Sequence, residues 1–284
     1  MSSDPKNEFE KIVPARLGKL LRDGNSSLTL FCVKKTGSTN VDAAKMLAAG
    51  TPPGDFVLVA ETQTAGRGRI GRRWESSASG NIYLSCGFRP DIAPEKLSNF
   101  TLWLGVAVAE ILCEKFGVPA RVKWPNDIFC RGKKLAGMLT EAHADARSAR
   151  GIVFGLGLNV NLDPTTLPPT VCAVATSLRA EIAAAKAKNS VAGTALDASA
   201  VCAETILAVE RAYAKFLAGT HTDALLERWN RFDWLAGKNV VALFGNEEIS
   251  GTASGIDAQG RIQILRPDGT VVAFSAGDVL LKKN

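Results

Sequence analysis

Residues Asp55-Phe-Val-Leu-Val-Ala-Glu61 form an apolar stretch that runs directly into Thr62-Gln-Thr-Ala-Gly-Arg-Gly-Arg-Ile-Gly-Arg-Arg-Trp74. The first part has the character of a buried strand. The second part places three glycines, four arginines and one tryptophan between Gly66 and Trp74. Arginine carries a fork of donors that fits phosphate and carboxylate oxygens, glycine admits close approach, and tryptophan can stack on a base. We therefore expect a strand followed by a loop that closes over a phosphate-bearing small molecule.

The spacing Gly66-x-Gly68-x-x-Gly71 also matches the fingerprint of dinucleotide-binding folds. That motif requires a helix that begins at its last glycine. Residues 72–80 show no apolar period of 3.6 and end in turn formers, so the sequence disfavours this fold. A solvated basic loop is the remaining alternative when the loop is considered alone.

A second motif is Lys123-Trp-Pro-Asn-Asp127, which is followed by a hairpin tip at Arg131-Gly132. Alternation along the next strand places Lys134 on the face opposite Leu135 and Leu139, beside whatever that face binds. A solvent-facing strand lysine explains Lys134 equally well on this evidence. Turn formation alone likewise explains the two polar residues that end the motif.

Two further stretches carry polar groups at the ends of predicted elements. Gly151-Ile-Val-Phe-Gly-Leu-Gly-Leu-Asn-Val-Asn161 reads as a strand whose internal glycines indicate close approach of a ligand or another backbone. Thr36-Gly-Ser-Thr-Asn40 precedes a predicted helix at 41–50, and Ser38 or Thr39 fits the N-cap position. Capping accounts for one hydroxyl, but it does not require three polar side chains in a row.

Together these motifs resemble those of biotin protein ligases, in order and spacing, over roughly residues 30–180. The matching pieces are Ser38-Thr39-Asn40, Gln63, Gly66–Arg72, Trp74, Lys123–Asp127, Lys134–Gly137 and Gly155–Asn159. A weaker match continues through Trp229 and Gly237 to the C-terminus. One departure is Ile70, where many family members have arginine, and it removes one phosphate contact.

The resemblance implies an α+β fold: a mixed β-sheet catalytic domain flanked by helices, as in class II synthetases, plus a small SH3-like β-barrel. We expect a helical extension over 1–27, the catalytic domain over 28–236 and the barrel over 237–284. Predicted strands lie at 28–35, 55–61, 81–88, 120–124, 127–131, 134–142, 151–160, 239–244, 248–256, 261–265 and 270–273. Further predicted helices lie at 98–116, 182–187, 194–218 and 225–234. The alanine-rich region 179–218 carries no recognised motif, and we expect support helices there.

The implied activity is ATP-dependent conversion of biotin to biotinyl-5′-AMP, then transfer of biotin to a lysine of the biotin carboxyl carrier domain of acetyl-CoA carboxylase or a related carboxylase. A lipoate or octanoate transferase of related fold is the alternative, and a non-enzymatic biotin-sensing repressor is a further one.

The resemblance implies Lys134 and Arg69 as catalytic residues. It implies biotin binding by Ser38, Thr39, Asn40, Gln63, Gly66, Arg67, Gly68, Arg69, Lys134 and Gly137. It implies ATP or adenylate binding by Arg67, Arg69, Arg72, Trp74, Asn126, Asp127, Lys134 and Asn159. Trp74 is expected to stack on adenine and Mg²⁺ to lie on phosphate oxygens, with no metal site built by the protein itself.

Composition limits the remaining function classes. The 284 residues are 46% hydrophobic, carry a net charge of +6 and contain no apolar run long enough for a membrane span. Six cysteines without a Cys-x-x-Cys pair indicate reduced thiols and a cytoplasmic protein. About 27 residues precede the first predicted strand, too few for a winged helix-turn-helix, so we expect no specific DNA binding. Oligomeric state stays open, with a homodimer as one option. Because every candidate ligand residue precedes Asn161, we expect loss of residues 237–284 to spare adenylation.

Overall fold

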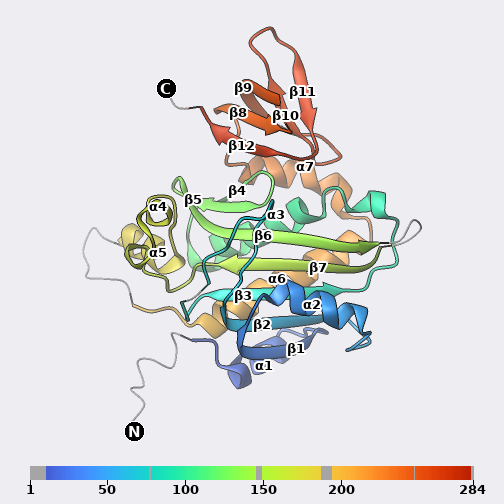
Figure 1. Cartoon of the computed structure of the whole chain (residues 1–284), viewed down its shortest axis with the longest axis vertical. Helices are drawn as coiled ribbons and strands as arrows, with labels where there is room; N and C mark the ends of the chain where they lie inside the picture. Colours follow the sequence, from blue (N-terminus) through green and yellow to red (C-terminus); the bar gives the residue numbers. More distant parts are fainter. Residues whose placement is uncertain (1–10, 77, 145–148, 187–193, 246, 283–284) are drawn as a thin grey trace.

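A seven-stranded mixed sheet forms the centre of the computed structural model, which describes residues 11–76, 78–144, 149–186, 194–245 and 247–282 (Figure 1). The strand order is β1-β2-β3-β7-β6-β5-β4. The strands are β1 (Thr29–Thr36), β2 (Phe56–Gln63), β3 (Ile82–Phe88), β4 (Ala120–Lys123), β5 (Asp127–Cys130), β6 (Lys133–Ala144) and β7 (Ala149–Leu158). β1 and β2 pair in parallel, and all other neighbours in this sheet are antiparallel. The predicted mixed sheet is confirmed.

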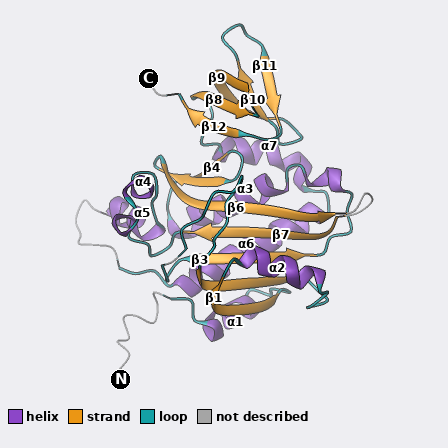
Figure 2. Cartoon of the chain, viewed as in Figure 1, coloured by secondary structure: helices purple, strands orange, loops and turns teal. Residues whose placement is uncertain are grey.

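Helices cover both faces of this sheet (Figure 2). α2 (Thr39–Ala48) lies on the front face in this view, and α3 (Phe100–Phe116) and α6 (Ala198–Leu217) lie behind it. α3 is apolar on nearly every side because it is packed between the sheet and α6, where Trp103 Nε1 donates a hydrogen bond to the carbonyl of Ala212 at 2.8 Å. The other helical segments are α1 (Pro14–Asp23), α4 (Pro169–Cys172), α5 (Leu178–Lys186), α7 (His221–Phe232) and the 3₁₀ turns Pro94–Leu97 and Pro164–Thr166.

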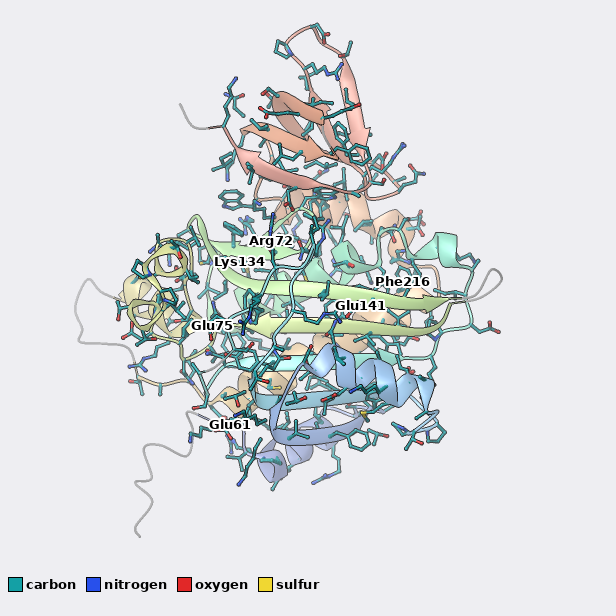
Figure 3. The ribbon with its side chains drawn as sticks, in the orientation of Figure 1. Glu61, Arg72, Glu75, Lys134, Glu141 and Phe216 are labelled. Carbon is teal, nitrogen blue, oxygen red and sulfur yellow. The ribbon has the colours of Figure 1, made fainter. Side chains whose placement is uncertain are left out.

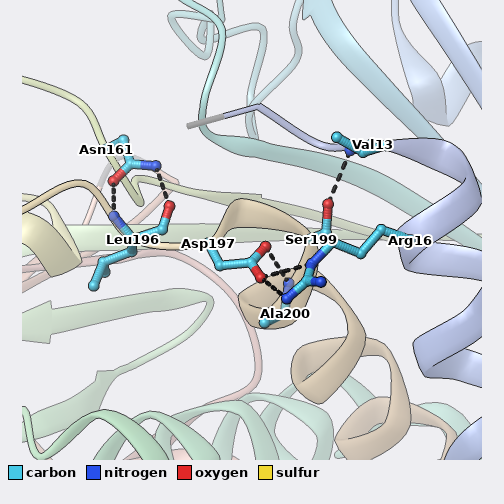
Figure 4. Close-up of polar contacts among 7 residues, drawn as sticks. All are labelled: Val13, Arg16, Asn161, Leu196, Asp197, Ser199 and Ala200. Carbon is cyan, nitrogen blue, oxygen red and sulfur yellow. Dashed lines mark hydrogen bonds and ion pairs between the residues drawn. The ribbon is translucent and has the colours of Figure 1, made fainter. Parts of the chain in front are cut away.

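The N-terminal end of α6 is tied to two other parts of the chain (Figure 4). Arg16 of α1 pairs with Asp197, the N-cap residue of α6. Asn161, just beyond β7, exchanges two hydrogen bonds of 2.8 and 2.9 Å with the backbone of Leu196. These contacts fix the rear helix layer to the sheet that carries the predicted site motifs.

The chain ends in a separate five-stranded antiparallel sheet of order β11-β10-β9-β8-β12, consistent with the predicted SH3-like module. Its strands are β8 (Asn239–Phe244), β9 (Glu247–Ile256), β10 (Ile262–Leu265), β11 (Val271–Phe274) and β12 (Asp278–Leu281). Among the described residues β11 and β12 do not pair, so the sheet is open between them. Trp124 Nε1 donates to the carbonyl of Gly260 at 3.1 Å, which brings this sheet against the motif Lys123–Asp127.

Several element boundaries differ from the sequence prediction. α7 begins at His221 instead of residue 225, whereas α2 begins at Thr39, directly after Ser38, one of the two predicted N-cap residues. β12 was not predicted, because four residues give too short a pattern to detect. The last residue of the helix predicted at 182–187 lies outside the described residues. No helix in the described part of the chain is both long and apolar enough to cross a membrane.

Candidate active site

A cavity lies where the arginine-rich loop crosses β6 and β7, between the start of α2 and β12. Figure 3 labels Lys134, Arg72 and Glu141 in this region of the sheet. Thirteen of the residues predicted from sequence line the cavity: Ser38, Thr39, Asn40, Gln63, Arg67, Gly68, Arg69, Arg72, Trp74, Asn126, Asp127, Lys134 and Gly137. Segments that are far apart in the sequence therefore meet in one place.

Two predicted residues, Gly66 and Asn159, lie outside this lining. A Cβ added at Gly66 would lie 2.2 Å from Ser76 Oγ and 2.5 Å from the carbonyl oxygen of Trp74, so the loop closes tightly there. The side-chain amide of Asn159 donates to the carbonyl of Thr176 at 2.9 Å. The structure thus gives both residues packing contacts, and their roles in binding biotin and ATP stay predictions.

The arginine-rich loop is a small hairpin and not the start of a helix. Trp74 N donates to the carbonyl of Gly66 at 3.0 Å, and Gly68 N donates to the carbonyl of Arg72 at 2.7 Å. The tip turns through Ile70, whose φ is 53°, and Gly71, whose φ is 70°. This geometry agrees with the exclusion of a dinucleotide-binding fold. The Ile70 side chain is 73% exposed at the tip.

The inner end of the cavity is formed by neutral hydrogen-bonding groups. The backbone N and the hydroxyl of Thr39 both donate to Gln63 Oε1, at 2.8 and 3.1 Å. Ser38 occupies the N-cap position of α2 but makes no side-chain capping bond. Its hydroxyl is buried and has no hydrogen-bond partner among the described residues. Such an unpaired buried group is unfavourable unless a ligand satisfies it.

Asn40 is held beneath this end by contacts with three strands. Ser85 Oγ of β3 donates to Asn40 Oδ1 at 2.7 Å. The Asn40 amide donates to the carbonyl of Leu139 at 3.1 Å and to Glu141 Oε2 at 2.9 Å, both on β6. A Cβ at Gly155 of β7 would lie 1.9 Å from Asn40 Oδ1, so glycine is required for this approach. Asn40 therefore lies in a fixed position on the sheet.

Two more strand glycines form a flat floor under Trp74. A Cβ at Gly157 would lie 2.3 Å from Trp74 Nε1, and one at Gly137 would lie 3.0 Å from Trp74 Cζ3. The internal strand glycines were predicted to mark close approach of a ligand or another backbone. Here Gly155 and Gly157 instead admit side chains from other segments, a contact that no local sequence pattern specifies.

Lys134 reaches the cavity because β6 is irregular at its start. The register of β5 and β6 shifts between the pairs Phe129–Lys134 and Ile128–Ala136, which is a β-bulge. The bulge breaks the predicted alternation, since Lys134 Cε lies on the same face as Gly137. Lys134 Nζ lies 2.7 Å from Asp127 Oδ1 and 5.2 Å from the centroid of the Trp74 ring. The simple alternation used to place Lys134 on one face of the strand is therefore wrong, although its side chain does point into the cavity.

The loop arginines contact oxygen atoms from three other segments. Arg67 NH2 lies 2.9 Å from Glu141 Oε1, and Arg72 pairs with Asp278 of β12. Arg69 donates to Asn126 Oδ1 at 3.4 Å and to the carbonyl of Gly277 at 3.3 Å. Burial lowers the pKa of Arg69, an effect that the nearby carboxylates of Asp278 and Asp127 oppose.

Sequence reasoning missed Lys123, Asp278 and Leu280, which all line the cavity. Burial lowers the pKa of Lys123, and the carboxylate of Asp127 acts in the opposite direction. Lys123 opens a recognised motif and could have been chosen on that signal. Asp278 and Leu280 carry no local signal, because β12 reaches the cavity only through the fold. The cavity therefore includes residues of the C-terminal sheet, whereas every candidate ligand residue chosen from sequence precedes Asn161. The expected effect of losing residues 237–284 stays a prediction.

The cavity thus joins a neutral hydrogen-bonding end to a cationic end. A polar uncharged ring fits the first, and oxygen atoms of a carboxylate and phosphates fit the second. In the part of the chain that the structure describes, no group of three or more His, Cys, Asp or Glu side chains forms a metal site. The geometry suits reactions in which negative charge accumulates beside fixed cations.

Comparisons with known proteins agree with this arrangement. The model of the "Biotin/lipoate A/B protein ligase family" matches residues 32–159, and that of the "Biotin protein ligase C terminal domain" matches residues 236–282. The biotin–[acetyl-CoA-carboxylase] ligase of Mycobacterium tuberculosis is 34% identical over 266 residues, 92% of each chain. The bifunctional ligase/repressor BirA of Bacillus subtilis is 33% identical over 239 residues, 84% of this chain and 70% of that protein. The structure of biotin protein ligase from Aquifex aeolicus in complex with biotin and ATP is similar with a TM-score of 0.70 at 27% identity, covering 90% of this chain and 99% of that one.

Proposed function

The chain belongs to the biotin protein ligase family, and from that premise we propose which of its residues carry each step of the reaction. The enzyme is an ATP-dependent biotin–[acetyl-CoA-carboxylase] ligase that activates biotin as biotinyl-5′-AMP and transfers it to a lysine of a biotin carboxyl carrier protein. One observation supports the assignment of residues above all others: a single cavity joins buried neutral polar groups to the cations of the arginine-rich loop and Lys134.

The neutral end is proposed to bind the ureido ring of biotin. That ring offers two N–H donors and one carbonyl acceptor, and none of them is charged. The unpaired hydroxyl of Ser38, the side chains of Thr39 and Gln63, and the fixed amide of Asn40 supply complementary groups. The carboxylate chain of biotin then extends along the glycine floor toward Lys134.

The cationic end is proposed to carry the chemistry. In the first step a biotin carboxylate oxygen attacks the α-phosphorus of ATP, the bond to the β-phosphate oxygen breaks, and pyrophosphate leaves. In the second step the carrier lysine amine attacks the carbonyl of the mixed anhydride, loses a proton and releases AMP. Both steps place negative charge near the α-phosphate, where Lys134 and Arg69 provide fixed positive charge. Arg67 and Arg72 offset the remaining phosphate charge.

Other contacts to the nucleotide are proposed on the same basis. Asn126 and Asp127 hold the positions of Arg69 and Lys134, and the indole of Trp74 offers a flat face for adenine. Mg²⁺ is expected on phosphate oxygens with mostly water as its other ligands, since Asp127 and Asp278 are the carboxylates in the lining. A bound ion would reduce the charge repulsion between phosphates.

Closure of the arginine-rich loop is proposed to keep water away from the anhydride. The partner is a biotin carboxyl carrier protein of a carboxylase, the class on which this family acts. The absence of specific DNA binding and the formation of a homodimer stay predictions.

The direct test is labelling of a biotin carboxyl carrier domain. The full chain is incubated with the carrier, ATP and biotin, and biotinylation is followed by mass spectrometry. We expect one added biotin on one carrier lysine, dependent on both ATP and biotin. Lipoate and octanoate in place of biotin form the matched control. Labelling by those acids, and none by biotin, would contradict the assignment.

A further inference from the structure

Among the described residues of the alanine-rich region 179–218, Glu181 of α5 is a buried acidic side chain, 6% exposed. Its carboxylate accepts a hydrogen bond of 2.6 Å from Thr176 Oγ1 and pairs with Arg131 at the β5–β6 hairpin tip. Cys130 Sγ lies 3.2 Å from its other oxygen. A carboxylate removed from water is costly unless such donors surround it, so this side chain holds several segments in fixed relation.

One of these segments is attached directly to Lys134. Lys134 N donates to the carbonyl of Val174 at 2.7 Å, and Thr176 N donates to the carbonyl of Lys134 at 2.9 Å. β7 pairs with β6 only from Ala136 onward, so this segment takes the place of β7 beside Lys134. Both hydrogen-bonding groups of the Lys134 backbone are thus satisfied by residues outside the β6–β7 ladder.

The same segment is attached to the end of β7 as well. The side-chain amide of Asn159 donates to the carbonyl of Thr176, and Leu178 N donates to the carbonyl of Asn159 at 3.0 Å. The hydroxyl of Thr176 links this attachment to Glu181. The path from the buried carboxylate to Lys134 therefore contains one side-chain bond, Thr176 to Glu181, and one backbone bond, Thr176 to Lys134.

We propose that Glu181 is a positioning residue for Lys134: through Thr176 it fixes the bulged start of β6 so that the Lys134 ammonium faces the reacting phosphate. This inference rests on the proposed role of Lys134 in adenylation. A bulge leaves its strand less restrained than a regular ladder does, so an external clamp is needed where the side chain must be placed accurately. Glu181 does not line the cavity, so its proposed effect passes through Thr176 and Lys134.

The first test compares Glu181→Gln with wild type in the rate of biotinyl-AMP formation, followed by pyrophosphate release. We expect kcat to fall about tenfold to a hundredfold, the usual effect of misplacing a catalytic group, with the KM for biotin unchanged. Thr176→Val should reproduce the loss, and Thr176→Ser should restore the wild-type rate because the hydroxyl returns. Glu110→Gln is the matched control, since it breaks a similar pair with Arg228 that does not line the cavity.

The second test asks whether the effect passes through Lys134. In a Lys134→Ala background, Glu181→Gln and Thr176→Val should change the residual rate by less than about twofold, because linked residues are non-additive. A full additional loss in that background would overturn the proposal, as would a wild-type kcat for Thr176→Val or a loss of kcat for Thr176→Ser equal to that of Thr176→Val. A wild-type rate for Lys134→Ala alone would instead contradict the proposed function of Lys134. The comparison of Thr176→Val with Thr176→Ser tests the proposal even when Glu181→Gln does not fold.

Discussion

The two ends of the active-site cavity are stabilised in different ways. At the inner end, Thr39, Gln63, Asn40 and Ser85 are neutral and hydrogen-bonded mainly to one another or to nearby backbone, with one further bond from the Asn40 amide to the carboxylate of Glu141. At the outer end each of three cations is paired with a carboxylate of the protein itself. The pairs are Lys134–Asp127, Arg67–Glu141 and Arg72–Asp278.

This difference predicts different costs of binding. The neutral end already has its geometry, so if biotin binds there as proposed, we expect little reorganisation of the protein. At the cationic end, phosphate oxygens compete with the protein's own carboxylates for the same donors. The carboxylates keep the cations in place, but they also reduce the free energy gained when ATP binds. Biotin affinity is then set by hydrogen bonds, and ATP affinity by exchange of ion pairs.

The largest expected effect is at the cationic end. Lys134→Ala should lower the rate of biotinyl-AMP formation by about 10²–10³-fold, because it removes a fixed charge beside the α-phosphate. Pyrophosphate release under single-turnover conditions measures this rate. Lys133→Ala is the control, since Lys133 is the exposed neighbour on the same strand and lines no part of the cavity. If both variants match wild type, the cationic end does not carry the chemistry.

Arg69→Gly should weaken retention of the intermediate. Its guanidinium ties the loop to Asn126 and to the carbonyl of Gly277, and loss of charged hydrogen bonds should weaken biotin binding about tenfold. Released biotinyl-AMP acylates any nearby amine. We therefore expect biotin on a bystander protein incubated with the enzyme, ATP and biotin, detected by blotting.

The control for this variant is Ile70→Gly. Ile70 is exposed at the loop tip, so the change adds backbone freedom without removing a cation. If Arg69→Gly labels the bystander protein and Ile70→Gly does not, the effect is due to the lost charge. Equal labelling by both variants assigns it to loop flexibility, and negligible labelling by both contradicts a guarding role for the loop.

Much of the fold was predictable from sequence because its elements have strong local patterns. The alternation of Ile82, Leu84, Cys86 and Phe88 predicted a half-buried strand at the position of β3, although the structure buries both faces of that strand. The apolar but interrupted segment at residues 98–116 predicted α3. β12 was missed because its four residues become a strand only by pairing with β8. The bulge before Ala136 was missed for a related reason, since pairing with β5 creates it.

Site residues were predictable from sequence only where charged residues and glycines are concentrated in one short segment. Arginines and glycines at residues 66–72 predict a phosphate-binding loop without any knowledge of tertiary structure, and the structure places all three of these arginines in the cavity lining. Glu141, Asp278 and Glu181 are ordinary acidic residues until the fold brings them to Arg67, Arg72 and Arg131 respectively. Partners of this kind depend on contacts between distant segments, and no pattern in the sequence specifies them.

A smaller effect is expected at the neutral end. Ser38→Ala should weaken biotin binding about fivefold, the value of one neutral hydrogen bond, as measured by calorimetry. The melting temperature should not fall, because the Ser38 hydroxyl has neither a capping bond nor another partner in the described structure. Ser85→Ala is the comparison, since its hydroxyl bonds to Thr39 and Asn40 and its loss should also lower stability. A stability loss for Ser38→Ala with unchanged biotin binding would mean that the hydroxyl is structural.

The smallest expected effect tests whether the Asp278 carboxylate competes with phosphate for Arg72 or instead positions Arg72 to bind phosphate. Asp278→Asn keeps the shape of the side chain but removes the charge that pairs with Arg72, whose side chain is 66% exposed. If the carboxylate competes with phosphate, the KM for ATP should fall about two- to fivefold, the range of an exposed ion pair, while kcat stays unchanged. The gain should shrink as salt concentration rises, because salt screens the original pair. Asp257→Asn is the control, as it removes a carboxylate paired with Arg261 in the turn between β9 and β10, where neither residue lines the cavity. A rise in the KM for ATP would show that Asp278 orients Arg72 for phosphate, and both ends of the cavity would then be preorganised.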